Sequence, residues 1–271
     1  MQKQEDGTIK LDITIPAADI IKAKAAVIDD YVANTTLPGF RKGKAPKKLV
    51  EENVDKDKLN EETLRKLLPE FYLTAIREHK ITPILNPKIQ VEKMEDQKDW
   101  KFTALTCETP KIDLNGYKEN VKKITAKSKI VIPGKEEKPV AFDEIVAELL
   151  KSVKAKIPKI IIDQEVDRLL SQTLDEIKKL GLTLEQYLGS TGKTAQDLRA
   201  DYEKKAENDV KLEFTLGKIA EEEKLIVEEK EIEEAISKAH SEAEKQNLES
   251  NRYLLASILR QQKTLDFLKN L

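Results

Sequence analysis

One twelve-residue segment, residues 37–48, combines a single phenylalanine with five cations. The cations are Arg41, Lys42, Lys44, Lys47 and Lys48. No Asp or Glu occurs from Tyr31 to Val50, although the formal net charge of the whole chain is -2. An aromatic ring beside unneutralised cations suits docking onto an anionic surface that also offers an apolar contact. This chemistry belongs to binding rather than to catalysis.

Glycine and proline give this segment a predicted shape. Gly39 and Gly43 can adopt positive φ, so a tight projecting loop is expected. Pro46 has the fixed φ that suits the first turn of a following helix. An ordinary solvated connector is the alternative, because a lone loop aromatic such as Phe40 usually packs onto its own core. Taken alone, the residues favour the connector by a modest margin.

A family resemblance reverses that preference. Residues 39–46, GFRKGKAP, resemble the ribosome-docking loop of trigger factor, a family of bacterial chaperones that act at the polypeptide exit tunnel. The similarity continues through the Pro-interrupted segment 64–72 and the Ile81-Thr82-Pro83 turn, and so covers roughly residues 1–112. A motif of eight residues in a matching context is specific.

The resemblance implies a role for each residue of the loop. Phe40 would insert into an apolar contact on a large-subunit protein beside the tunnel. Arg41 and Lys42 would pair with phosphate or carboxylate groups of protein and RNA there, and Lys44 would add longer-range attraction. The residues expected to shape the loop are Gly39, Gly43 and Pro46.

Composition argues against a general nucleic-acid-binding protein and against a membrane protein. Charged residues make up 36% of the chain and aromatic residues 5%, which is typical of helix-rich architecture with modest cores. The net charge is +1 over residues 1–112, +3 over 113–157 and -6 over 158–271, so a general surface for DNA or other nucleic acid is not supported. With no export signal and no long apolar run, a cytoplasmic protein without membrane contact is expected.

The sequence gives little support to catalysis, metal binding or a cofactor. His79 and His240 are the two histidines, and no sequence motif pairs either of them with a nucleophile. Cys107 is the single cysteine and is expected to be a small core residue. Runs of glutamate such as 221–223 alternate with lysines and are interpreted as solvated helical faces rather than metal sites.

Residues 1–112 are predicted to form an α+β domain, a small antiparallel sheet with helices. Alternating apolar residues predict strands at 8–15, 88–93 and 100–107. Helices are expected at 17–33, 46–54 and 59–79, and Pro69 predicts a kink or a break near Leu68. From residue 113 to residue 139 the pattern weakens, and a linker is expected there, with one extended piece at 128–132.

Residues 140–271 are predicted to form a mainly α domain of antiparallel helices. Thr183 and Thr194 begin capping-box patterns that mark two helix starts. The expected helices cover residues 142–153, 158–180, 184–189, 195–214, 228–245 and 251–268.

This half also resembles trigger factor, most plainly in residues 181–188, GLTLEQYL, and 191–194, TGKT. The resemblance implies a helical cradle that holds unfolded chains, and it leaves open a weak homodimer. Trigger factors generally carry a prolyl isomerase domain between the two matching halves. Residues 117–156 are too few to hold that domain, so isomerase activity is expected to be absent.

Polypeptide binding would have to use aliphatic and scattered aromatic side chains, because Met1 and Met94 are the two methionines. Two helical stripes supply candidates, although most residues of such stripes are expected to be buried core. The candidates are Leu198, Tyr202, Phe214, Leu254, Leu255 and Ile258.

These observations lead to one preferred hypothesis and two alternatives. The preferred one is an ATP-independent, ribosome-associated chaperone that shields nascent chains, because tethering turns weak contacts into effectively intramolecular ones. A cytosolic holdase or assembly chaperone that acts away from ribosomes is the second. A prolyl isomerase is the third, and the missing central domain argues against it.

Overall fold

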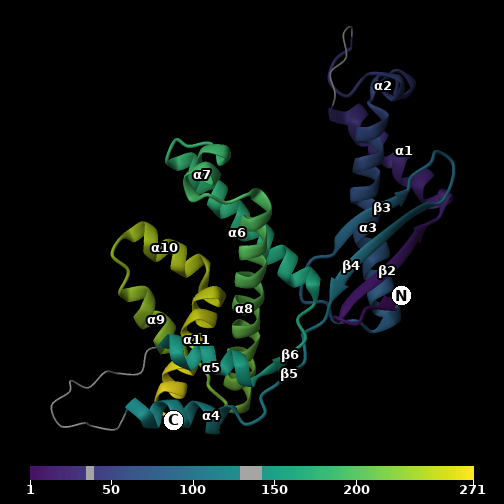
Figure 1. The fold of residues 1–271 in the computed structure, drawn as a ribbon. Helices are drawn as coiled ribbons and strands as arrows, with labels where there is room; N and C mark the ends of the chain where they lie inside the picture. Colours follow the sequence, from purple (N-terminus) through teal and green to yellow (C-terminus); the bar gives the residue numbers. More distant parts are fainter. Residues whose placement is uncertain (35–39, 129–141) are drawn as a thin grey trace. The chain divides into compact units, whose positions relative to one another are not determined.

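The computed structural model describes residues 1–34, 40–128 and 142–271. They divide into two compact units, Met1–Thr109 and Pro110–Leu271 (Figure 1). Unit 1 is a small antiparallel sheet with helices, and unit 2 is mainly helical, as the sequence predicts for the fold class.

Unit 1 is built around a sheet with the strand order β1-β2-β4-β3. Its elements are β1 (Gln2–Lys3), β2 (Thr8–Ile15), α1 (Ala17–Asn34), α2 (Lys47–Asn53), α3 (Lys56–His79), β3 (Lys88–Lys93) and β4 (Trp100–Cys107). The predicted bounds of β2, β3 and β4 are confirmed. The short strand β1, which pairs with β2, was not predicted.

Strand alternation places the core of unit 1 on one face of this sheet. In β2, Ile9, Leu11, Ile13 and Ile15 all join the core, opposite Trp100 and Phe102 of β4. Residues of α1 and α3 complete that core from the same side. Because side chains alternate along a strand, the opposite face carries polar residues such as Lys10 and Thr14.

Helix α3 is continuous through Pro69, so of the kink or break predicted near Leu68 the break is wrong. Proline removes one backbone hydrogen bond from a helix interior. Leu67 and Tyr72, on either side of Pro69, are both buried against the sheet. Burial of this face outweighs the local preference for a break.

Unit 2 has its largest core where α4, α5, α8 and α11 meet. Its helices are α4 (Tyr117–Ser128), α5 (Phe142–Ser152), α6 (Lys159–Lys179), α7 (Leu184–Thr191), α8 (Ala195–Glu222), α9 (Glu229–Ser237), α10 (Glu242–Ser250) and α11 (Arg252–Lys269). A short ribbon, β5 (Ile112–Asp113) with β6 (Lys154–Ala155), was not predicted.

Helix α4 corrects the expectation of a linker over residues 113–139. Tyr117 and Val121 are buried in the main core of unit 2, so residues 117–128 belong to the folded domain. The Tyr117 hydroxyl donates to Glu223 Oε1 over 3.0 Å, and Lys118 pairs with the same carboxylate. Most of the extended piece expected at 128–132 lies outside the described residues.

The predicted helix 228–245 is wrong, because the chain forms two helices there. Helix α9 ends at Ser237, and α10 begins after Ser241. Ser241 Oγ accepts a hydrogen bond from the Glu244 backbone N–H over 3.1 Å, which is a helix N-cap. The turn between the helices lets Ile232 and Ile236 of α9 share a cluster with Leu255 of α11.

Candidate partner-binding sites

The basic loop connects α1 to α2, and its described part begins at Phe40. Gly39 lies outside the described residues. The Phe40 side chain belongs to no described core cluster, and the residue is 37% exposed. The Pro46 carbonyl accepts hydrogen bonds from the backbone N–H groups of Leu49 and Val50 over 3.0 and 3.2 Å, so Pro46 is the N-cap of α2, one residue before the predicted role in the first turn.

A tight turn follows Phe40. The Lys44 backbone N–H donates to the Arg41 carbonyl over 2.9 Å, and Gly43 has φ +77°. A Cβ atom at Gly43 would lie 3.3 Å from the Ala33 carbonyl oxygen at the end of α1. Positive φ and close approach both require glycine here.

Three cations of the loop have no partner within the described parts of the chain. Arg41, Lys42 and Lys44 are exposed and form no ion pair with any described residue. Lys47 differs, because its ammonium lies 2.6 Å from Asp29 Oδ1 on α1. The exposed ring and three unneutralised cations form a surface that can meet an apolar patch bordered by anions. We call Phe40–Lys44 the basic tip.

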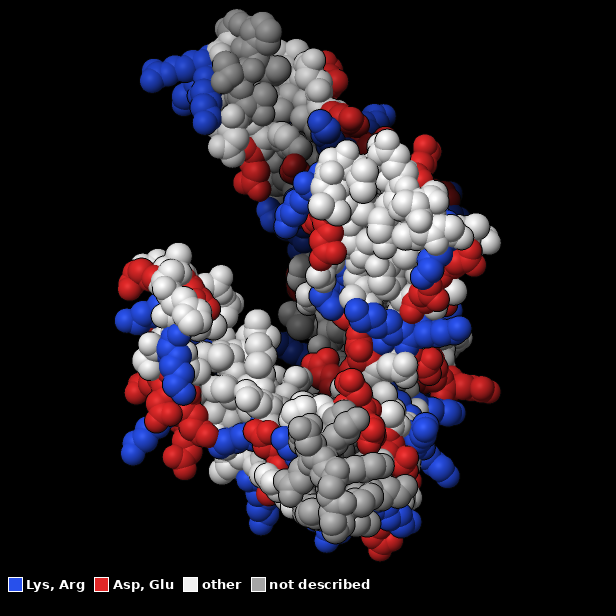
Figure 2. Space-filling model, turned by 60° about the vertical axis from the view of Figure 1, so that its left-hand side comes forward, with Lys and Arg blue, Asp and Glu red and all other residues white. Residues whose placement is uncertain are grey.

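A second exposed surface lies where α6 turns into α7. Residues 180–192 contain Glu185 as their single charged residue. Leu180, Leu182 and Leu184 are 73%, 41% and 38% exposed, and α7 has no buried residue. Figure 2 shows a broad area without charged side chains over this end of unit 2. We call these three leucines the leucine tip.

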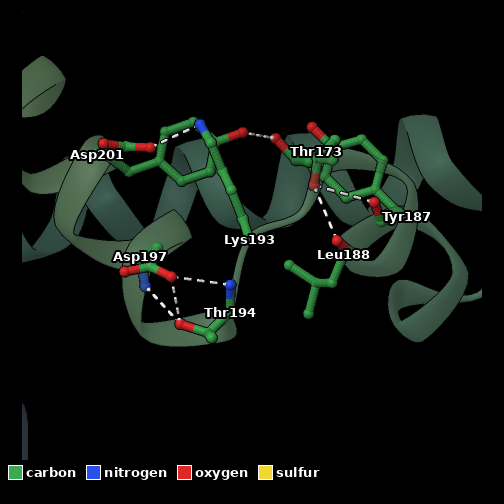
Figure 3. A network of polar contacts seen from close by, with 9 residues as sticks. Thr173, Tyr187, Leu188, Lys193, Thr194, Asp197 and Asp201 are labelled. Carbon is green, nitrogen blue, oxygen red and sulfur yellow. Dashed lines mark hydrogen bonds and ion pairs between the residues drawn. The ribbon is translucent and has the colours of Figure 1, made fainter.

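Both predicted capping boxes support the leucine tip. The Gln186 backbone N–H donates to Thr183 Oγ1 over 3.2 Å, and the Thr183 backbone N–H donates to Gln186 Oε1 over 2.9 Å. At the start of α8, Thr194 and Asp197 repeat this reciprocal pattern (Figure 3). These hydrogen bonds, with the Thr194 hydroxyl the largest contributor, hold the pKa of Asp197 below its usual value.

Side chains of α6 and α8 fix the base of this tip. Lys193 Nζ lies 2.7 Å from Asp201 Oδ2, and the Thr173 and Tyr202 hydroxyls are 2.5 Å apart (Figure 3). Polar contacts therefore fix the position of α7, which has no buried residue of its own. The exposure of the three leucines was not predicted, although the nearly uncharged run 180–192 is a signal in a chain with 36% charged residues.

The predicted polypeptide-contact residues divide by burial. Leu198 and Leu255 are buried at 7% and 9% exposure, and Tyr202 packs beside a core cluster. Phe214 is half-buried. These four are therefore at least partly covered in this conformation, and their predicted role in polypeptide binding stays a prediction. The exposed members are Leu254 at 59% and Ile258 at 52%, next to Tyr253 at 92%.

The groups considered for catalysis are not assembled into a site. His79 and His240 are exposed on different units, and the described residues hold no cluster of His, Cys, Asp or Glu that could bind a metal ion. Burial raises the pKa of the Cys107 thiol to about 11, so the reactive thiolate is disfavoured. None of the described helices is both long and apolar enough to cross a bilayer.

Comparison with known proteins places both units in one family. A family model for the bacterial trigger factor protein matches residues 1–138, and one for the C-terminus of that protein matches residues 118–270. The two matches overlap, which leaves no stretch between them for a separate prolyl isomerase domain.

Individual relatives are similar over the N-terminal region. Trigger factors of Macrococcus caseolyticus, Staphylococcus carnosus and Geobacillus kaustophilus are 33%, 35% and 37% identical over 117 residues. That alignment covers 43% of this chain and 27% of each relative.

A solved structure from work on promiscuous substrate recognition by the trigger factor chaperone shares the fold. Its TM-score is 0.63 at 13% identity, with 98% of both chains covered. Because the two family models each match more than half of the residues, this chain belongs to the bacterial trigger factor family.

Proposed function

We propose that this chain is an ATP-independent cytoplasmic chaperone that docks on the ribosome through the basic tip and shields nascent chains with apolar surfaces of unit 2. This proposal rests mainly on the exposed Phe40 ring beside Arg41, Lys42 and Lys44. These three cations have no ion-pair partner among the described residues. Ribosomal RNA supplies phosphates, and a ribosomal protein supplies an apolar contact for the ring.

The basic tip suits a ribosomal partner for two physical reasons. An aromatic anchor in a desolvated pocket is typically among the strongest contributors to an interface. Cations that meet RNA release its counterions, so they supply affinity that depends on salt. A glycine-shaped, hydrogen-bonded turn also lowers the ordering cost of binding.

Ribosome co-sedimentation tests this docking role. We expect the triple variant Phe40→Ala, Arg41→Ala, Lys42→Ala to bind at least about ten-fold more weakly, because it loses the anchor and two cations. A matched control, Leu73→Ala, Lys58→Ala, Lys88→Ala, removes the same kinds of exposed side chain elsewhere in unit 1. Equal binding by the two triple variants would refute the docking role.

Clients are proposed to meet the leucine tip and the exposed residues of α11, namely Tyr253, Leu254 and Ile258. Exposed apolar clusters of this kind mark interaction surfaces. We expect Leu180→Ser, Leu182→Ser, Leu184→Ser to weaken suppression of aggregation of a chemically unfolded protein. Suppression unchanged from the unmutated chain would exclude the leucine tip as a client surface.

Chaperone action away from ribosomes is the second candidate, and the location of the apolar surfaces on unit 2 favours it. Without ribosomes, the Phe40 triple variant is expected to suppress aggregation as well as the unmutated chain. If the second candidate describes the main role, loss of ribosome binding leaves the protection of newly made proteins intact. A protease-coupled proline peptide assay is expected to show no isomerase activity.

A further inference from the structure

The chain that returns from the basic tip to α2 touches the body of unit 1 at three residues. Gly43 approaches Ala33, Ala45 is 5% exposed, and the exposed Lys47 pairs with α1. Lys44 and Pro46, which lie between these residues, are exposed. We call residues 43–47 the return limb.

Lys47 differs from the other cations of the segment. Its ammonium donates to Asp29 Oδ1 over 2.6 Å and to the Ala25 carbonyl over 3.4 Å, both on α1. Lys47 is also the first residue of α2, whose first turn contains no acidic residue. A cation is unfavourable at this positive end of a helix dipole. The Asp29 carboxylate offsets that cost.

The neighbouring acid on α1 has a different role. Asp30 Oδ2 lies 3.3 Å from Lys66 Nζ on α3, so this pair joins two helices and does not involve the loop. Both pairs are largely exposed, and each contributes little to overall stability. The Asp29–Lys47 pair nevertheless joins the end of the return limb to α1.

We infer that the Asp29–Lys47 ion pair is a positioning contact that anchors the return limb to α1 and thereby holds the adjoining turn with Lys42 and Lys44 outward toward an anionic partner. This inference rests on the proposed docking function. A limb anchored to α1 loses less conformational freedom on binding, and the neighbouring cations are already oriented. Asp29 and Lys47 are therefore positioning residues and do not themselves contact the partner.

Substitution of Asp29 separates this inference from simple electrostatics. Asp29→Asn makes the protein one charge more positive, so long-range attraction alone predicts tighter binding to ribosomes. Loss of positioning predicts the opposite, an affinity about two- to five-fold weaker, as expected for one exposed pair. Asp30→Asn is the matched control, because it makes the same charge change at the adjacent residue without touching the return limb.

Two further measurements complete the test. The charge swap Asp29→Lys, Lys47→Asp keeps the net charge and is expected to recover at least part of the lost affinity. Hydrogen exchange at the Lys44 amide, which is bonded to the Arg41 carbonyl, is expected to be faster in Asp29→Asn than in Asp30→Asn. Thermal unfolding midpoints of the two single variants should agree, which a general structural defect would not produce.

The outcomes distinguish this inference from the proposed function. If the unmutated chain binds ribosomes, and Asp29→Asn binds as tightly as Asp30→Asn or more tightly, the positioning role is overturned and docking stands. If the unmutated chain does not bind ribosomes, the proposed function fails first. Unchanged exchange at Lys44 in Asp29→Asn would also overturn the positioning role.

Discussion

Two of the charged turns in unit 1 treat their charges in opposite ways. In the turn between β3 and β4, Glu95 pairs with Lys93 and Lys98 over 2.9 and 2.5 Å. Asp96 lies 2.9 Å from Lys24 on α1, and Asp99 accepts the Ala17 backbone N–H over 2.9 Å. The basic tip has no such partners within the described residues.

This difference indicates what each turn does. The β3–β4 turn uses its charges to join the sheet to α1, with the Lys24 ammonium also 5.3 Å from the centre of the Trp100 ring. The basic tip leaves Arg41, Lys42 and Lys44 exposed and without ion pairs to the described residues. Charge that a fold does not neutralise is available to a partner. The β3–β4 turn is therefore a structural element, and the basic tip is the element that we propose for binding.

The largest expected effect comes from removing the unpaired charge. Arg41→Gln, Lys42→Gln, Lys44→Gln should lower the slope of log affinity for ribosomes against log salt by about 2, since each phosphate contact contributes about 0.7–0.9. Titration of binding between low and physiological salt measures this slope. The control Lys58→Gln, Lys88→Gln, Lys101→Gln makes the same charge change elsewhere in unit 1. An equal slope for both variants would contradict the claim that the cations of the basic tip are the ones that contact the ribosome.

The next effect concerns the shape of the basic tip. Gly43→Ala should weaken ribosome binding and lower the free energy of unfolding by about 1 kcal/mol, because alanine is strained at φ +77° and approaches Ala33. Denaturant melts and co-sedimentation measure the two effects. Gly116→Ala is an informative control, because it has φ +66° with no atom near its added Cβ.

A complementary change in the β3–β4 turn should alter stability and leave binding intact. Lys24→Ala removes both the ion pair with Asp96 and the contact with the Trp100 ring, which together should cost about 1 kcal/mol of unfolding free energy. Thermal or denaturant unfolding measures the loss. A reduction in ribosome binding by this variant, at unchanged unfolding, would contradict the separation of the two turns.

The smallest effect is a pH dependence confined to the β3–β4 turn. Hydrogen bonds from Lys98 and Lys93 lower the pKa of Glu95 from 4.5 to about 2 in the folded protein. Its contribution to stability is therefore fully present above about pH 4.5 and is lost as the pH falls toward 2. Glu95→Gln should reduce the acid sensitivity of unit 1, and unfolding curves at pH 3 and pH 7 would show it.

Much of the fold could be predicted because local patterns agree with the tertiary structure. Strict alternation gave the bounds of β2 and β4, and reciprocal side chains at Thr183 and Thr194 marked the starts of α7 and α8. The failures have tertiary causes. Helix α4 is mostly polar and becomes recognisable only when Tyr117 and Val121 meet the core of unit 2.

For the proposed binding sites, the sequence indicated residue types but not tertiary contacts. The sequence identified Phe40 and its neighbouring cations, but it could not show that Lys47 is paired with Asp29, because that contact joins residues on different helices. Leu198 and Leu255 followed the same apolar periodicity as Leu254 and Ile258. Periodicity marks an apolar face, and neighbouring helices decide which of its residues are covered.

Site-specific photo-crosslinking tests the contrast between the two turns most directly. A photoreactive amino acid would replace Phe40 in the basic tip or, in a second variant, Gln97 in the β3–β4 turn. With purified ribosomes, position 40 should crosslink to large-subunit protein or RNA beside the exit tunnel, and position 97 should not. No crosslink from position 40, or equal crosslinking from both positions, would contradict the account.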